Sequence, residues 1–462
     1  MNSPKKILIT VFRGQSASNI LRSGVLAGLL QNGLEVVLLT TREREESYQK
    51  EFRHEQMSVI SVADFKEKIG DTIVRFLAHN SVRNERVLFK HVEDLYGHKK
   101  TPGALLRFLG KRAIGFLGLI PGVRALIRIF AFRFPSSHSE VSSILRHENP
   151  DLVFCPDVVQ DMDVIVLREA KRLGIATAGL VSGWDNLTNP GLLRIVPDTL
   201  LVHSPWLKRA AVDLQGIPEE KIKMVGIPQY DSFFRKDFLK PRVEFLQSLG
   251  IDPKSRLILF AAMGSQRLAP YEWETPQMIN DAIERGDLPP DCLVAARPHP
   301  KYGIGGYAKK PEGRHLLIDE PAKYLSASVE SWDMERKHMD HLANILYHAD
   351  VVVTGASTIT IDAAVLDRPV INVVFDGKHT LPDFQSIRKN YYHFTHYIAL
   401  VKTKGMRLVF SEKELIGWIK KYLDNPSLDR EERKQVVHDF VGFTDGRSVE
   451  RIVSALAEKF TA

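Results

Sequence analysis

The chain has 462 residues, of which 44% are hydrophobic and 26% are charged, and its formal net charge is +7. That length is more than one hydrophobic core fills, and the even composition excludes a fibrous or disordered chain, so we expect a globular protein of two or more domains. The excess of positive charge favours an anionic partner, such as a phosphate-bearing ligand, a membrane surface or nucleic acid.

The cysteines and the first residues indicate a cellular compartment. Cys155 and Cys292 are the two cysteines, each in an apolar stretch, and their spacing fits neither a metal site nor a redox motif. The opening MNSPKK leads directly into a strand-like run, without the apolar core of a signal peptide, and no apolar run is long enough to span a bilayer. We therefore expect a cytoplasmic protein.

Short apolar segments alternate with helical patterns along the first half of the chain. Buried strands are predicted at residues 6–12, 34–41, 152–155, 176–181 and 199–203. A helix is predicted at residues 20–31, after a polar loop at 13–19 that lacks the glycine spacing of a dinucleotide site. Strands separated by helices predict a parallel sheet that is covered on both faces.

A second series of the same kind follows a charged, linker-like stretch at residues 233–255. Its strands are predicted at residues 257–262, 292–296, 350–354 and 369–374. We therefore predict an α/β fold of two doubly wound, Rossmann-like domains that face a central cleft. The predicted parts are an N-terminal acceptor domain at 1–240, with a basic apolar helical insertion at about 101–134, a C-terminal nucleotide-donor domain at 241–446, and a C-terminal helix at 447–462 that packs back on the first domain.

The second domain carries residues suited to phosphate where its strands end. After the strand at 350–354, Gly355 permits a tight turn, and Ser357 and Thr358 open a helix whose unpaired N–H groups favour an anion. The same two residues also fit a plain helix cap, and the pattern does not decide between the two interpretations.

Two more loops of this domain are candidates for donor binding. Arg297 and His299 lie in the rigid segment ARPHPK, where the guanidinium can bind phosphate oxygens and the histidine can donate to phosphate or sugar. Gly264 and Ser265 resemble a backbone nest for an oxyanion, although a plain turn explains them equally well.

The first domain offers an acceptor site after its strand at 176–181. There Trp184 can serve as an apolar platform, Asn186 as a hydrogen-bonding group and Asp185 as a general base, unless the segment is an ordinary turn. Ser16, in the loop after the first strand, is a further acceptor-binding candidate, and Asp157 is the second candidate for the base.

No metal site is expected. Asp161 and Asp163 look like an Asp-x-Asp metal motif, but they begin a predicted helix, where carboxylates offset the helix dipole. His338 and His341 lie three residues apart in a highly charged run, and no third ligand accompanies them.

Residues 101–134 contain six basic residues and no acidic one, and most of the rest are apolar. Pro121 and Gly122 divide the stretch into two predicted helices. The composition is typical of interfacial helices that insert an apolar face into an anionic membrane surface. A buried helix pair with arginines at its rim is the alternative, and nucleic acid is not expected because the interleaved side chains are aliphatic rather than stacking.

Together these motifs resemble the GT-B transferases of bacterial surface-polysaccharide synthesis, near the CDP-glycerol glycerophosphotransferases and the related UDP-N-acetylglucosamine 2-epimerases. The segments that carry the resemblance are GWDNLT at 183–188, VGIPQYDSF at 225–233, RPHP at 297–300, VTGASTITIDAAVLDRP at 353–369 and TDGRSVER at 444–451. It implies a nucleotide-linked donor on the second domain, contacted by His299, Ser357 and Thr358, an acceptor on the first domain, and no cofactor or structural metal.

One departure from the family bears on the donor. Glycerophosphotransferases tend to have an Asp-Tyr-Ser-Ser run where this chain has residues 355–358, GAST. The departure favours a sugar nucleotide over a glycerol-phosphate donor. We therefore expect transfer of a sugar, with glycerol phosphate as the second possibility, from an activated nucleotide to a hydroxyl of a lipid-linked surface glycan, with Asp185 and His299 as catalytic residues. A sugar-nucleotide 2-epimerase and a non-catalytic scaffold that binds polysaccharide or lipid carrier are the alternatives.

Overall fold

The computed structural model describes residues 5–63, 68–96, 103–189, 191–264, 269–300, 310–320, 336–383, 385–389 and 391–460. The chain divides into two compact units, one made of Met1–Asp231 with Val441–Ala462, the other of Ser232–Phe440. The predicted boundary lay near residue 240, and the helix predicted at 447–462, which was expected to pack back on the first domain, belongs to the first unit.

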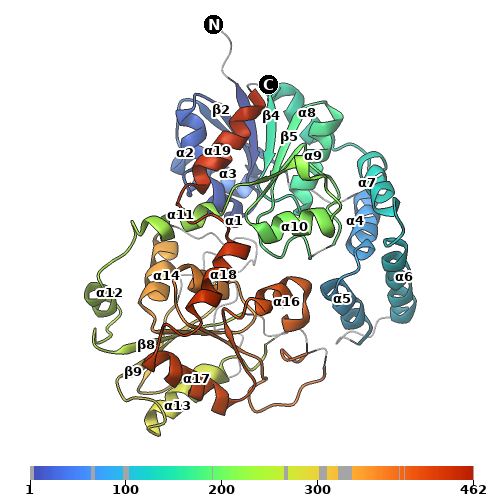
Figure 1. The fold of residues 1–462 in the computed structure, drawn as a ribbon. Helices are drawn as coiled ribbons and strands as arrows, with labels where there is room; N and C mark the ends of the chain where they lie inside the picture. The colour runs from blue at the N-terminus through green and yellow to red at the C-terminus, as the bar shows by residue number, and fades with distance from the viewer. Residues whose placement is uncertain are drawn as a thin grey trace. The chain divides into compact units, whose positions relative to one another are not determined.

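The N-terminal unit is built on a seven-stranded parallel sheet, sheet A, with the order β3-β2-β1-β4-β5-β6-β7 (Figure 1). Its strands are β1 Lys6–Thr10, β2 Glu35–Thr41, β3 Met57–Val62, β4 Leu152–Cys155, β5 Ala176–Leu180, β6 Thr199–Val202 and β7 Ile222–Met224. The central strands are buried on both faces, which explains why they read as continuous apolar runs.

Helices cover both faces of sheet A. One core cluster joins the sheet to α2 Val25–Gln31 and to α19 Ser448–Ala457, which lie side by side. The other cluster joins it to α8 Ser139–Glu148, α9 Asp161–Arg172 and α10 Pro205–Asp213. Helix α19 comes from the end of the chain, so the N-terminal unit is completed by residues that follow the whole of the second unit.

A layer of four helices is inserted between β3 and β4. These are α4 Ile69–Ser81, α5 Glu85–Tyr96, α6 Ala104–Leu117 and α7 Val123–Arg133, of which α6 packs on α4 and α5, and α7 packs on α4 (Figure 1). The charged helix α3 Arg42–Glu51 precedes them and lies against β3.

The second unit is built on a six-stranded parallel sheet, sheet B, with the order β10-β9-β8-β11-β12-β13. Its strands are β8 Arg256–Ala261, β9 Cys292–Arg297, β10 Leu316–Ile318, β11 Val351–Thr354, β12 Val370–Val373 and β13 Arg407–Val409. Helices α13 Glu274–Glu284 and α17 Glu412–Asp424 pack on one face in a single core cluster. The other helices of the unit are α12 Arg242–Ser248, α14 Arg336–His348, α15 Ile359–Val365, α16 Thr395–Lys402 and α18 Arg430–Phe440.

The predicted class, two doubly wound Rossmann-like halves, is confirmed. The stretch at 233–255 that reads as a linker is helical instead, because α11 Pro228–Arg235 runs into it and α12 lies within it. Strands β3, β7, β10 and β13 were not predicted; three of them have only three residues each, too short for a periodic signal.

Candidate functional site

Sheet B reverses its winding between β8 and β11, because the connection from β8 leads to β9 on one side and that from β11 leads to β12 on the other. Ligands of doubly wound sheets bind outside the carboxyl ends of the strands at such a point. The predicted donor residues all follow β8, β9 or β11, which are adjacent strands, so the topology brings their loops to one edge of the sheet.

The loop after β11 is held by a buried hydroxyl group. The hydroxyl of Tyr397 accepts hydrogen bonds from the backbone N–H of Ser357 at 3.1 Å and from the side-chain amide of Asn372 at 2.7 Å. The same hydroxyl lies 3.2 Å from Oγ1 of Thr360 and 3.5 Å from the backbone carbonyl of Gly355, either of which can accept its proton. Ser357 stays half-buried and Thr358, the residue before α15, is exposed. The network thus fixes the backbone while leaving both predicted donor side chains at the surface.

The turn after β8 already binds a carboxylate from the protein itself. The backbone N–H groups of Met263 and Gly264 donate to the two oxygens of Glu272, at 2.6 and 2.9 Å. The predicted nest at Gly264 is therefore an anion-binding turn in geometry, but Glu272 occupies it. Ser265, its predicted partner, lies outside the described residues.

The loop after β9 rests on a buried ion pair. Arg297 is 4% exposed, and its guanidinium pairs with Asp319, whose other oxygen lies 2.7 Å from Nε2 of His341. Burial acts to raise the pKa of Asp319, but the hydrogen bond from His341 and the charge of Arg297 outweigh it and lower the pKa. The Arg297 side chain therefore points into the unit, whereas His299, two residues on, is half-buried.

The predicted acceptor loop after β5 is a compact turn. The backbone carbonyl of Asp185 accepts from the N–H groups of Thr188 and Asn189, both at 2.9 Å, and from the Thr188 hydroxyl at 2.8 Å. Asn186 donates through its side-chain amide to the hydroxyl of Ser182 at 3.2 Å. Asp185 and Asn186 are half-buried, as is Trp184, whose carbonyl accepts from the indole N–H of Trp206 at 3.1 Å.

The loop after β1 contains Ser16, the remaining predicted acceptor residue. It forms the short helix α1 Gly14–Ser16 and continues into a π-helical turn at Ala17–Leu21. Ser16 is buried, whereas Arg13 at the start of the loop is exposed. The π-helical turns of proteins are often found at functional sites, and this one lies at the carboxyl edge of sheet A.

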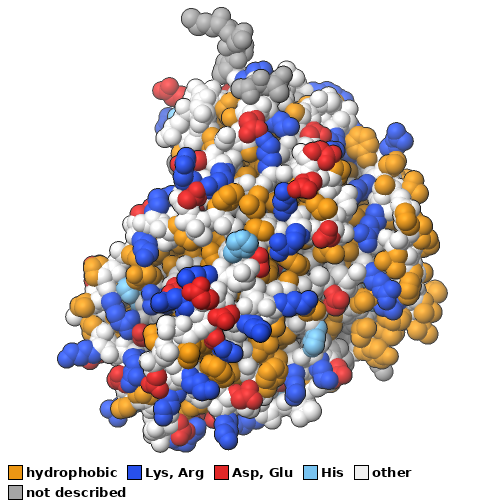
Figure 2. Space-filling view, in the orientation of Figure 1, with side chains coloured by type: hydrophobic (Ala, Val, Ile, Leu, Met, Phe, Trp, Pro, Cys, Tyr) orange, Lys and Arg blue, Asp and Glu red, His pale blue; other side chains and the backbone are white. Residues whose placement is uncertain are grey.

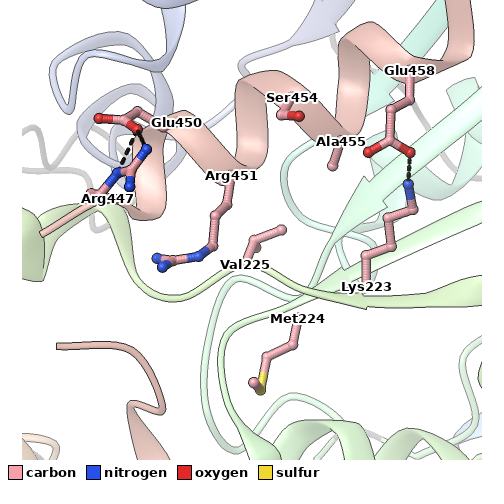
Figure 3. Close-up of a pocket in the computed structure, with 9 residues that line it drawn as sticks. All are labelled: Lys223, Met224, Val225, Arg447, Glu450, Arg451, Ser454, Ala455 and Glu458. Atoms are coloured by element: carbon pink, nitrogen blue, oxygen red, sulfur yellow. Dashed lines mark hydrogen bonds and ion pairs between the residues drawn. The ribbon is translucent and has the colours of Figure 1, made fainter. Parts of the chain in front are cut away.

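Two segments that carry the family resemblance have a structural role. The carboxylate of Asp231, in the segment at 225–233, accepts from the backbone N–H groups of Ser448 and Val449 at the start of α19, both at 2.9 Å. Next to it a pocket of about 620 Å³ lies between α19 and β7 (Figure 3). The basic side chains that line the pocket form ion pairs: Lys223 with Glu458, Arg447 with Glu450, and Arg451 with Asp445.

No group of three His, Cys, Asp or Glu side chains that could hold a metal ion occurs in the described part of the chain. Asp161, from the metal-like pair of the sequence, pairs instead with Arg194 and, at 3.0 Å, with Arg75. No described helix combines the length and apolar character needed to cross a membrane.

Sequence reasoning missed the residues that hold the donor loops in place. Tyr397 acts on Ser357 from 40 positions away, and Asp319 and Glu272 reach the other two loops from outside any recognisable motif. Only the three-dimensional contacts identify them.

Comparison with known proteins gives a family and a fold. The model of the family described as CDP-glycerol:poly(glycerophosphate) glycerophosphotransferase matches residues 192–458, more than half of the chain. No relative was found among curated protein sequences.

Solved structures of similar fold cover nearly the whole chain. A putative UDP-N-acetylglucosamine 2-epimerase from Listeria monocytogenes aligns with a TM-score of 0.55 at 12% identity, over 99% of this chain and 97% of that one. The UDP-N-acetylglucosamine 2-epimerase from Neisseria meningitidis, bound to UDP-N-acetylglucosamine, gives 0.52 at 13% identity, over 98% and 100%. A variant of the wall teichoic acid polymerase TagF gives 0.52 at 10% identity, over 99% and 90%. At these identities the likeness establishes the GT-B fold alone.

Proposed function

The chain belongs to the CDP-glycerol:poly(glycerophosphate) glycerophosphotransferase family, and from that membership we propose that it moves a sugar or glycerol phosphate from a nucleotide-activated donor to a hydroxyl of a membrane-associated surface glycan. The transfer takes place at the cytoplasmic face of the membrane. The observation that carries the proposal is the family match, which spans the loops after β8, β9 and β11.

The donor is held by the second unit. His299 and the pair Ser357 and Thr358 follow strands that flank β8, and their side chains are half-buried or exposed. They would contact the phosphates or the transferred group, and positive or hydrogen-bonding groups there stabilise the charge that develops as the nucleotide leaves. Arg297 contributes through its ion pair with Asp319, which stiffens the backbone just before His299.

Two structural features bear on the alternatives. A 2-epimerase would share the fold, as the similar structures do, but it has no need of a surface for a membrane-bound acceptor. A scaffold would need no preformed donor loop, whereas Tyr397 and Asn372 hold the Ser357 backbone in place. Both features favour the transferase.

A thermal-shift screen tests the donor site. CDP-glycerol, UDP-N-acetylglucosamine and the free nucleotides are each titrated, and a ligand that binds the folded state raises the melting temperature with its concentration. We expect one nucleotide series to stabilise the protein, and His299→Ala to weaken that shift and abolish transfer. The matched control is His438→Ala, an exposed histidine of the same unit. Absence of any shift would refute the transferase and the epimerase together.

We further propose that the helical layer α4–α7 docks on an anionic membrane. Hydrophobic side chains gather over α6 and α7, at the right of the view in Figure 2. The exposed apolar residues of the layer are Ile69, Ile73, Phe76, Val92, Tyr96, Leu105, Leu106, Leu109, Phe116, Leu117, Leu126 and Ile129. Exposed apolar patches of this extent mark interaction surfaces in soluble proteins.

Four of the six basic residues in 101–134 differ clearly in their surroundings. Arg107 and Arg133 are exposed beside the apolar residues. Arg124 and Arg128 turn inward, where their guanidinium groups donate to the backbone carbonyls of Gly118, Leu214, Leu193 and Gln215 at 2.7 to 3.0 Å. Burial lowers the pKa of Arg128 to about 10. Among the basic residues of the described segment 103–134, Arg107 and Arg133 are the exposed ones.

Vesicle co-sedimentation tests the surface. Leu106→Asp and Arg107→Glu should each reduce binding to vesicles that contain phosphatidylglycerol, and loss of the positive charge of Arg107 should alone account for a decrease of roughly fivefold. Val243→Asp, at an exposed apolar position of the second unit, is the matched control. Equal sedimentation of Leu106→Asp and Val243→Asp would refute the membrane surface.

A further inference from the structure

Sheet A also reverses its winding, between β1 and β4. These strands are neighbours, and their connections lead to β2 on one side and β5 on the other. The crevice at their carboxyl ends is therefore the position where a doubly wound sheet binds a ligand. Arg13 follows β1 and Asp157 follows β4, so one cation and one carboxylate lie on its two sides.

A second buried carboxyl group interacts electrostatically with Asp157. Asp163, in the first turn of α9, is 2% exposed, and its Oδ1 is hydrogen-bonded to the hydroxyl of Thr10 at the end of β1. Asp157 is 4% exposed. The described ionisable groups that act on the pair are Arg13 and Cys155, whose sulfhydryl donates to the backbone carbonyl of Asp163 at 3.6 Å.

The two carboxyl groups have different surroundings. Asp157 accepts a hydrogen bond from the backbone N–H of Val159 at 3.3 Å and one from Ser182, and it feels the charge of Arg13, all of which favour its ionised form. Burial nevertheless raises the pKa of Asp157. Burial and the neighbouring charge of Asp157 raise the pKa of Asp163 well above its usual range. Burial and the charge of Asp157 therefore both favour the protonated form of Asp163.

We propose that Asp157 is the general base of the transfer reaction, and that Asp163, which is hydrogen-bonded to Thr10 at the end of β1, is a positioning residue of the same site. This inference rests on the proposed function and replaces the sequence-based choice of Asp185 as base. A carboxylate in an apolar setting is a stronger base than one in water, which suits removal of a hydroxyl proton.

The acceptor O–H bond breaks and its proton passes to a carboxylate oxygen of Asp157. The acceptor oxygen bonds to the phosphorus, or to the anomeric carbon, of the transferred group. The bond from that atom to the leaving phosphate oxygen breaks, and the nucleotide departs as an anion. Asp157 returns to its ionised form by releasing the proton to water.

Activity tests the base. The release of CMP from CDP-glycerol and of UDP from UDP-N-acetylglucosamine is measured with water in place of the acceptor. Asp157→Asn should slow the release by about 10²–10⁴-fold, while the nucleotide-induced shift in melting temperature stays that of the wild type. Asp151→Asn, at the amino end of the same strand, is the matched control and should keep the rate.

Stability against pH tests the carboxyl pair without any substrate. Because the pKa of Asp163 is raised in the folded state, the stability it contributes is lost as the pH rises through that value. The asparagine of an Asp163→Asn variant does not titrate. The melting temperature of the variant, relative to that of the wild type, should therefore increase as the pH rises from acid to alkaline. A residue with only a packing role would give the same difference at every pH.

The outcomes separate the two proposals. A normal rate in Asp157→Asn, or a pH-independent difference for Asp163→Asn, would overturn this inference and leave the transferase intact. Loss of activity in Asp185→Asn with full activity in Asp157→Asn would return the base to Asp185. A wild-type protein that binds neither nucleotide and releases none would overturn the transferase and, with it, the base.

Discussion

Replacing Asp231 with alanine should destabilise the N-terminal unit by about 3–7 kcal/mol. The carboxylate of Asp231 accepts from two backbone N–H groups of α19, both at 2.9 Å, and is 2% exposed, so water cannot take its place. A hydrogen bond to a charged group contributes about 1.5–3 kcal/mol, and a carboxylate at a helix N-terminus adds about 0.3–1 kcal/mol. The free energy of unfolding lost in Asp231→Ala should therefore exceed the loss on replacing an ordinary helix N-cap residue with alanine.

Hydrogen exchange is the appropriate assay, because a chain of two units need not unfold in one step. The amides of α19 should lose protection in Asp231→Ala, whereas those of α13 and α17 in the second unit should not change. Asp231→Asn keeps one acceptor oxygen, so the protection of α19 in this variant should lie between that of the wild type and that of Asp231→Ala. Asp237→Ala removes an exposed partner of Arg235 and should shift stability by no more than about 0.5 kcal/mol.

Unchanged protection of α19 in Asp231→Ala would refute the reasoning. The apolar face of the helix, with Ile452, Val453 and Leu456, would then hold it in place alone. The two hydrogen bonds at its start would contribute nothing measurable to stability. The segment at 225–233 would in that case need another explanation.

Two further predictions concern buried groups. Burial lowers the pKa of His203 to about 4, so the unfolded chain, with a pKa of 6.5, takes up the proton first as the pH falls. We expect the wild type to lose about 3 kcal/mol more than His203→Asn between about pH 6.5 and 4, measured by urea unfolding; equal losses would contradict it. Tyr397→Phe removes the hydroxyl that accepts from Ser357 and should cost about 1–3 kcal/mol and reduce the nucleotide-induced shift in melting temperature. Tyr392→Phe, in the neighbouring ring, is the control. If nucleotide raises the melting temperature of Tyr397→Phe as much as that of Tyr392→Phe, the Ser357 loop is not part of the donor site.

The alternation of strands and helices was predictable because buried parallel strands leave an unbroken apolar run. The run at residues 6–12 shows this, since β1 is buried along its length after Lys6. The edge strand β7 left no such signal, as it has three residues and only its first is buried. Sequence periodicity therefore predicted the centre of each sheet and missed its margins.

The direction of a side chain was not predictable from its charge. Six basic residues in 101–134 read alike in sequence, yet Arg124 and Arg128 bind backbone carbonyls inside the unit while Arg107 is exposed. Their partners, Leu214 and Gln215, lie 90 and 87 positions away along the chain. Only the packing of α7 on the body of the unit decides which arginines remain for an anionic surface.

The carboxylates of this protein divide by what they neutralise. Asp231 compensates the start of α19, Glu272 fills the turn after β8, and Asp319 neutralises Arg297, so each is already paired with a fixed positive group of the protein. Such groups stabilise the fold and cannot take a proton without losing that partner. Asp157 differs, because burial raises its pKa although Arg13, the N–H of Val159 and Ser182 all favour its ionised form. A buried carboxyl group at the switch point of a sheet, under the influence of an exposed arginine, has the surroundings expected of a group that exchanges protons with a substrate.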